Sequence, residues 1–197
     1  QSTLRFIEAA RPGDRLAIVT FSDEANIISP LTLDRTQLAA SVANMEGMGG
    51  SHIWDAVKFA LDKVVGPKTL ERRRAVVLMS DGDDGALSRT ETGGSKTTFA
   101  DLIEQVRQTD TLIVPIYLDT EDNYGNSYLK EEYENARRAL RLLADESGGS
   151  YYHARKLSDL NGVYEQVIND LGKVYSLGYK PTNATHDSTW RWVNVSI

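Results

Sequence analysis

The sequence predicts an α/β fold with a doubly wound, mostly parallel central sheet and helices on both faces. Three continuous apolar runs, at residues 15–21, 74–80 and 111–118, are rich in β-branched side chains, as is typical of strands buried on both faces. Segments whose apolar residues recur at helical spacing separate these runs, and this alternation indicates parallel strands connected by helices.

The remaining elements follow from the spacing of apolar residues along the chain. Residues 25–32 come after the first strand and a short polar turn, which indicates a β-hairpin. The second strand of this hairpin is antiparallel to the first. Pro30 places it at the sheet edge, because proline has no backbone N–H group to donate to a neighbouring strand. We expect helices over residues 2–10, 34–45, 53–65, 97–108, 130–146 and 157–174, and a short strand within residues 148–154.

Two segments with alternating polarity end the chain, VYSLGYKP at residues 174–181 and WRWVNVSI at residues 190–197. Their period of two predicts two strands around a polar turn, that is, a C-terminal β-hairpin. A chain of 197 residues without a linker-like segment is expected to form one domain. We divide it into an α/β domain at residues 1–173 and a hairpin extension of the same domain at residues 174–197.

The composition argues against several classes of function. A net charge of −6 argues against a nucleic-acid partner, and the lack of cysteine excludes disulfides, thiolate zinc sites and cysteine nucleophiles. No apolar stretch approaches the ~20 residues of a membrane-spanning helix. The sequence also lacks the glycine-rich phosphate loops and the nucleophile elbow of common enzyme families, and its three histidines show no metal or triad spacing.

Polar residues gather where predicted buried strands end. Ser80-Asp81-Gly82-Asp83-Asp84 follows the run AVVLM, Asp119 follows IVPIYL, and Gly49-Gly50-Ser51-His52 opens a helix. Ligands of open α/β sheets bind at the carboxyl ends of the strands, and a set of oxygen ligands favours magnesium, manganese or calcium. The alternative interpretation is that these residues form ordinary solvated loops and helix N-termini.

The segments PGDRLAIVTFSDEANIISPLT, MGGSHIWDAVKFAL and RAVVLMSDGDD occur in the order and spacing found in von Willebrand factor type A domains. The sequence resembles this family over nearly its whole length. Its tail, which includes LADESGGSYYHA and YSLGYKP, resembles a bacterial branch that is abundant in acidobacterial genomes. The resemblance implies the doubly wound fold, an adhesion or scaffold role in protein binding, and a location outside the cell, in the periplasm or at the cell surface.

The resemblance also implies a metal-ion-dependent adhesion site built from three loops. Matched residue by residue, the metal contacts of this chain are Ser51, where the family has threonine, and Asp81. Among the neighbouring residues, Asp83 and Asp84 are expected to tune the local potential or to meet solvent. Supporting positions around the site, or positions on its rim, are implied for Ser80, Gly50, His52, Asp83, Asp84 and Asp119.

The first loop of that site, Asp-x-Ser-x-Ser, does not occur in the 197 residues. In this family it follows the first strand, which lies in the middle of the sheet. The loss of a central strand exposes two apolar ladders. We therefore expect that the chain is a fragment of its natural protein, or that another segment, such as a swapped strand, fills the place of this strand.

Three functions are left open by these residues. The favoured one is a binding module whose divalent ion, Mg²⁺ or else Mn²⁺ or Ca²⁺, takes a carboxylate from a partner protein. The others are a metal-free structural or interaction domain with a degenerate site, and a metal-dependent hydrolase. A hydrolase needs a base and a basic group for phosphate, and His52 is the only evident base, so no catalytic residue is assigned. With Ser51 and Asp81 alone, we expect weak metal binding.

Overall fold

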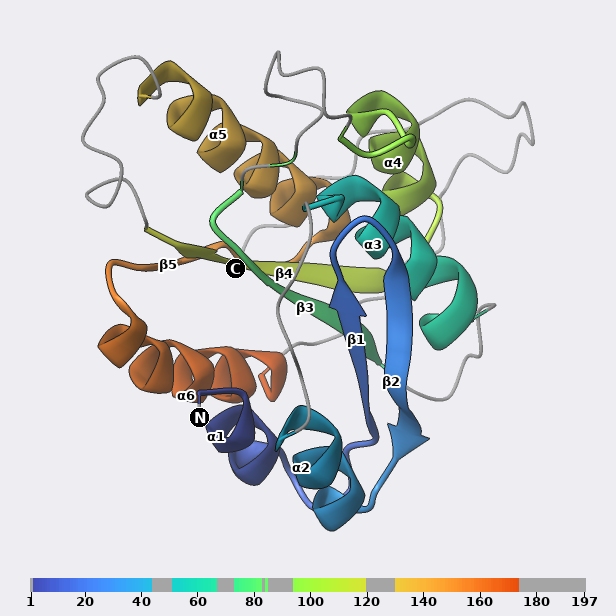
Figure 1. Cartoon of the computed structure of the whole chain (residues 1–197), viewed down its shortest axis with the longest axis vertical. Coiled ribbons are helices and arrows are strands. Elements are labelled where there is room, and N and C mark those ends of the chain that lie inside the picture. Colours follow the sequence, from blue (N-terminus) through green and yellow to red (C-terminus); the bar gives the residue numbers. More distant parts are fainter. Residues whose placement is uncertain are drawn as a thin grey trace, which may run out of the picture.

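The computed structural model describes residues 2–43, 51–66, 73–82, 84, 94–119 and 130–173. Within them, three parallel strands form one sheet, and two antiparallel strands form a separate pair (Figure 1). The parallel sheet consists, in spatial order, of β3 (Arg74–Ser80), β4 (Thr111–Leu118) and β5 (Tyr152–Ala154), and the pair consists of β1 (Leu16–Phe21) and β2 (Ala25–Thr32). This arrangement confirms the predicted parallel strands and the antiparallel hairpin.

The helices lie close to their predicted positions. Thr98 begins α4 because its side chain accepts a hydrogen bond from the amide of Asp101 at 3.1 Å. The helices are α1 (Ser2–Ala9), α2 (Arg35–Ala43), α3 (Ile53–Phe59) with its π-helical continuation η1 (Ala60–Val65), α4 (Phe99–Arg107), α5 (Lys130–Ser147), the short 3₁₀ turn η4 (Leu157–Asp159) and α6 (Leu160–Leu171). No helix among the described residues is long and apolar enough to cross a membrane.

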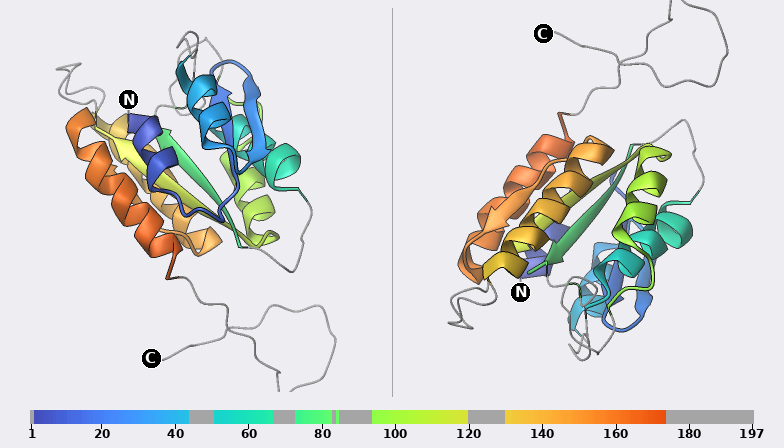
Figure 2. Two further views of the ribbon diagram at one scale, coloured as in Figure 1. Left: turned by 90° about the horizontal axis from the view of Figure 1, so that it is seen from below. Right: turned by 90° about the horizontal axis from the view of Figure 1, so that it is seen from above.

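Helices cover both faces of the parallel sheet, which Figure 2 shows from two opposite sides. On one face, α3, α4 and α5 bury a cluster that includes Trp54, Leu102 and Leu140. On the other face, α6 packs with the partly buried Phe6 of α1. Successive residues of β4 point alternately into these two clusters, as the pleat of a strand requires. The doubly wound architecture is therefore confirmed.

The strands β3 and β4 differ in burial, although the sequence predicts that both are buried on both faces. Six of the eight residues of β4 are buried, whereas Leu78 is the one buried residue of β3. Met79 of β3 is 38% exposed, and every residue of β1 is half-buried. The prediction of full burial is right for β4, which has a strand on each side, and wrong for β1 and β3, which each have one paired edge among the described residues.

The predicted C-terminal hairpin and the boundary between residues 173 and 174 concern a segment outside the described residues. The last described element, α6, ends at Leu171 and is followed by a turn that includes Gly172 and Lys173. The hairpin extension therefore stays a prediction.

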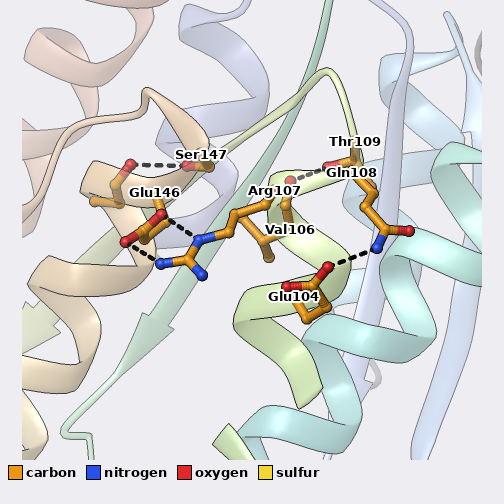
Figure 3. Close-up of polar contacts among 8 residues, drawn as sticks. Glu104, Val106, Arg107, Gln108, Thr109, Glu146 and Ser147 are labelled. Carbon is orange, nitrogen blue, oxygen red and sulfur yellow. Dashed lines mark hydrogen bonds and ion pairs between the residues drawn. The ribbon is translucent and has the colours of Figure 1, made fainter. Parts of the chain in front are cut away.

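A bidentate ion pair joins the carboxyl-terminal ends of α4 and α5 (Figure 3). Arg107 donates through Nε to one oxygen of Glu146 at 2.7 Å and through Nη2 to the other at 2.8 Å. These hydrogen bonds, with the attraction of the two charges, lower the pKa of Glu146 and raise that of Arg107. The pair holds the two helices in register on the same face of the sheet.

Because the pKa of Glu146 is lower in the folded chain than the ordinary 4.5, the ion pair stabilises the fold above pH 4.5. This contribution is lost as the pH falls through the lowered folded pKa. We expect Glu146→Gln to destabilise the chain slightly at pH 7, because the Arg107 side chain is 47% exposed and solvent screens the pair. Thermal melts from pH 3 to pH 7 check this, and a difference from the wild type that is equally large at pH 3 would contradict an electrostatic origin.

Candidate functional site

The carboxyl ends of β1 and β3 meet at the N-terminus of α3. After β1, the carbonyl oxygen of Ser22 accepts a hydrogen bond from the amide of His52 at 3.0 Å. After β3, the carboxylate of Asp84 contacts the first residues of α3. The two strands therefore end at the same place and run in the same direction. We call the residues gathered there the crest, which comprises residues 51, 52, 80–82 and 84.

Asp84 connects three segments of the crest and its surroundings. It is 0% exposed, and its Oδ1 accepts hydrogen bonds from the amides of Ile53 at 2.5 Å and Trp54 at 3.4 Å. The hydroxyl of Ser95 donates to the same oxygen at 2.7 Å. A carboxylate in this position satisfies helix N-terminal amides and interacts favourably with the helix dipole. Of the two roles expected for Asp84, tuning the local potential or meeting solvent, the second is wrong because the residue is fully buried, where it fixes the loop after β3 to α3.

A second carboxylate, Asp55, fixes the same turn of α3 to the segment before α4. Its two oxygens accept hydrogen bonds from the amides of Lys96 and Thr97, each at 2.8 Å, and its own amide donates to Ser95 at 3.1 Å. Partial burial by itself raises the pKa of Asp55, but the hydrogen bonds from Thr97 and Lys96 outweigh it, and the pKa lies below its ordinary value. Asp55 was not among the predicted site residues, although an acidic residue in the first turn of a predicted helix is a signal for such a role.

The turn that carries Asp81 depends on Gly82. The amide of Gly82 donates to the hydroxyl of Ser80 at 3.0 Å, and its carbonyl oxygen accepts from the amide of Asp84 at 3.0 Å. The φ angle of Gly82 is 79°, in the left-handed region that favours glycine, and an added Cβ would lie 2.9 Å from the Cβ of Ala136. The turn therefore packs closely on α5 and leaves Asp81 half-buried at the crest.

Asp119, which follows β4, contacts His153 of β5. Its carboxylate lies 3.2 Å from Nε2 of His153, and the imidazole ring meets the ring of Tyr117 edge-on with 5.2 Å between the centroids. Burial, more than any other influence, raises the pKa of Tyr117 to about 12, so its hydroxyl stays neutral at physiological pH. The contact with His153 thus connects Asp119 to β5 at the end of the sheet.

Two of the residues predicted for the site, Gly50 and Asp83, lie outside the described residues. Of the others, Ser51, His52, Ser80 and Asp81 are half-buried and share the crest. Among the described residues, no group of three or more histidines or carboxylates is placed to hold a metal ion. Ser51 and Asp81 would offer a hydroxyl and a carboxylate, which are the hard oxygen ligands that suit Mg²⁺, but they would form only part of a coordination shell.

Comparisons with known proteins agree with this fold. Residues 1–83 match the family model of the von Willebrand factor type A domain. A UPF0353 protein of Nocardia farcinica is 24% identical over 215 aligned residues, which include the whole of this chain. The chain spans 61% of the length of that relative.

Two solved structures extend the likeness beyond the matched segment. The von Willebrand factor type A structure from Catenulispora acidiphila has a TM-score of 0.61 at 17% identity, over 85% of this chain and 36% of that one. The vWF domain of the type V pili tip protein Mfa5 from Porphyromonas gingivalis has a TM-score of 0.63 at 13% identity, over 91% of this chain and 89% of that one. The chain therefore has the fold of a von Willebrand factor type A domain, and its first 83 residues match that family.

Proposed function

We propose that this chain is a protein-binding module whose crest holds a divalent ion and, through it, a carboxylate of a partner protein. The observation that carries the proposal is the pair of hydrogen bonds from the amides of Ile53 and Trp54 to Asp84. Because Ser51 lies two residues before Ile53 and Asp81 directly precedes Gly82, these bonds fix the two proposed ligand loops to each other. A metal site needs ligands held in this way before the ion arrives.

In this proposal, Ser51 and Asp81 hold the ion, and water fills its other positions. Mg²⁺ binds proteins through one or two carboxylates and retains several water molecules, one of which the partner's Asp or Glu replaces. The ion supplies a local positive charge. This charge matters because the chain itself carries a net charge of −6, which disfavours the approach of an acidic partner.

The family match and the fold support a binding role in general terms, since domains of this kind are interaction modules more often than enzymes. The likeness to a domain of a pili tip protein supports a location outside the cell, in the periplasm or at the cell surface. The crest also lacks an arrangement of groups for hydrolysis, because His52 is the one evident base among its described residues.

A melting experiment tests the metal site. At an ion concentration several times Kd, we expect Mg²⁺ or Mn²⁺ to raise the Tm of the chain by about 2–4 °C over a sample in chelator. Asp81→Ala should abolish this rise, and Ser51→Ala should weaken it. Asp145→Ala, which removes an exposed carboxylate of α5, is the matched control and should retain the full rise.

The second candidate is a metal-free interaction domain with a degenerate site. It is favoured by the lack of a three-ligand cluster among the described residues and by serine at position 51, where the family has threonine. A chain whose Tm responds to no divalent ion, and whose Asp81→Ala variant melts like the wild type, would favour this candidate over the metal site.

A further inference from the structure

Two arginines of α5 lie over tyrosine rings at the end of the sheet where β5 lies (Figure 1). The guanidinium carbon of Arg137 is 5.6 Å from the centre of the Tyr117 ring, and that of Arg141 is 5.0 Å from the centre of the Tyr151 ring. Tyr117 lies beside His153 of β5 in the ladder, and Tyr151 directly precedes β5. Residues four positions apart share one face of a helix, so we call the two arginines and the two tyrosines the arginine face.

The tyrosine rings hold the two guanidinium groups in place for an acidic ligand. A guanidinium group over a ring keeps its N–H donors in its own plane, and a carboxylate accepts two such donors at once. Because the ring limits the motion of the side chain, less conformational entropy is lost when a ligand binds. Burial raises the pKa of Tyr117 to about 12 and also raises that of Tyr151, so neither hydroxyl becomes an anion that neutralises the arginines at physiological pH.

The surroundings of the arginine face are basic, although the chain as a whole has a net charge of −6. Residues 136–156 carry a net charge of +3, from two acidic residues, Asp145 and Glu146, and five basic ones, Arg137, Arg138, Arg141, Arg155 and Lys156. All five of these basic residues except Arg137 are exposed, and Glu146 is held in its ion pair with Arg107. The charge of this part of the surface therefore attracts an anionic group.

We propose that the arginine face binds an extended acidic segment of a partner protein, with Arg137 and Arg141 each taking one of its carboxylates. Clusters of arginine are one of the recurring means by which proteins recognise acidic motifs. One turn of helix separates the two arginines by about 5–6 Å. Side chains two positions apart in an extended segment are about 6.6–6.8 Å apart, so carboxylates at every second position match this spacing.

The charge of the chain also limits what the arginine face accepts. A net charge of −6 disfavours a nucleic acid, whereas a segment with two or three carboxylates matches the local net charge of +3. The inference goes beyond the proposed metal site, since the arginine face includes neither Ser51 nor Asp81. Its test is made in chelator, where no carboxylate binds through an ion, so failure of the metal site leaves the result of this test unaffected.

The probe is a fluorescently labelled peptide that alternates threonine and glutamate and contains three glutamates. The matched peptide has glutamine at the three glutamate positions. Fluorescence anisotropy in chelator measures Kd for each peptide at low and at physiological salt. We expect the glutamate peptide to bind at least about tenfold more tightly at low salt, because glutamine cannot form charge-assisted hydrogen bonds with arginine as a carboxylate does. We expect this preference to decrease as salt is added.

Three variants make the test specific. Arg141→Gln should weaken binding of the glutamate peptide about tenfold, because it removes one of the two guanidinium groups. Arg141→Lys keeps the charge but not the planar pair of donors, so it should restore only part of the affinity. Arg5→Gln is the matched control. It removes one positive charge from α1, where the Arg5 side chain is 70% exposed, and it should bind like the wild type.

Several outcomes would overturn the proposal. Equal affinity of the wild type for the two peptides would do so without any variant. An equal loss in Arg5→Gln and Arg141→Gln would reduce the effect to the overall charge of the chain. A thymidine oligonucleotide that binds more tightly than the glutamate peptide, and loses its affinity in Arg141→Gln, would assign the arginine face to a nucleic acid instead.

Discussion

Replacing Asp84 with alanine is expected to lower the free energy of unfolding by about 2–4 kcal/mol. The substitution removes the acceptor of three hydrogen bonds, from the amides of Ile53 and Trp54 and from the hydroxyl of Ser95, at a position with no solvent exposure. Each donor left without a partner in the interior is destabilising by about 1–3 kcal/mol, less what local relaxation recovers. Urea unfolding followed by circular dichroism measures the loss.

Two further variants separate the hydrogen bonds from other effects of the substitution. Asp84→Asn keeps an oxygen for the amides of α3, and we expect it to be destabilising by about half as much as alanine. Asp159 stands at the N-cap of α6 without a side-chain capping bond, so Asp159→Ala should change stability by no more than about 0.5 kcal/mol. A loss below about 1 kcal/mol in Asp84→Ala would contradict the proposed role of this carboxylate in fixing the crest.

Gly149→Ala is expected to be destabilising by about 3 kcal/mol or more. Gly149 lies between α5 and β5, where its amide donates to the carbonyl oxygen of Ala144 at 2.9 Å. A methyl group at this position would overlap the carbonyl oxygen of Ile113 and approach the rest of that peptide unit. Because Ile113 lies inside the central strand β4, its backbone cannot move aside without disturbing the ladder with β3. The loss is measured by the same urea unfolding.

Gly162 in α6 provides the opposite case. Nothing lies within 4 Å of a Cβ added to Gly162, and the residue is helical. We therefore expect Gly162→Ala to stabilise the chain by about 0.5–1 kcal/mol, because alanine restricts the unfolded chain more than glycine does. If the two substitutions changed stability by similar amounts, the close approach of the Ile113 backbone would not be the reason for glycine at position 149.

Over the residues that the structure describes, the identity and order of the strands and helices were predicted correctly because their signals are local. The run TLIVPIYL carries apolar side chains on both faces of the strand that it predicts, and it forms the buried central strand β4. The run AVVLM has the same character, yet β3 is half-covered. A residue pattern specifies which side chains need burial, but the neighbouring strand that provides it lies far away in sequence.

The candidate site, like the fold, was predictable from the sequence only in part. The sequence placed Ser51 and Asp81 at the ends of predicted elements, and the fold brings the two segments to one crest. From the sequence alone, Asp84 is a residue of a polar loop. In the tertiary structure it is buried under α3 and accepts hydrogen bonds from amides 30 and 31 residues away. Local periodicity thus determined the elements of this protein and the loops between them. Contacts between distant segments decided which carboxylate faces the crest and which one holds it together, because the burial and the hydrogen-bond donors around a side chain exist only after the chain has folded.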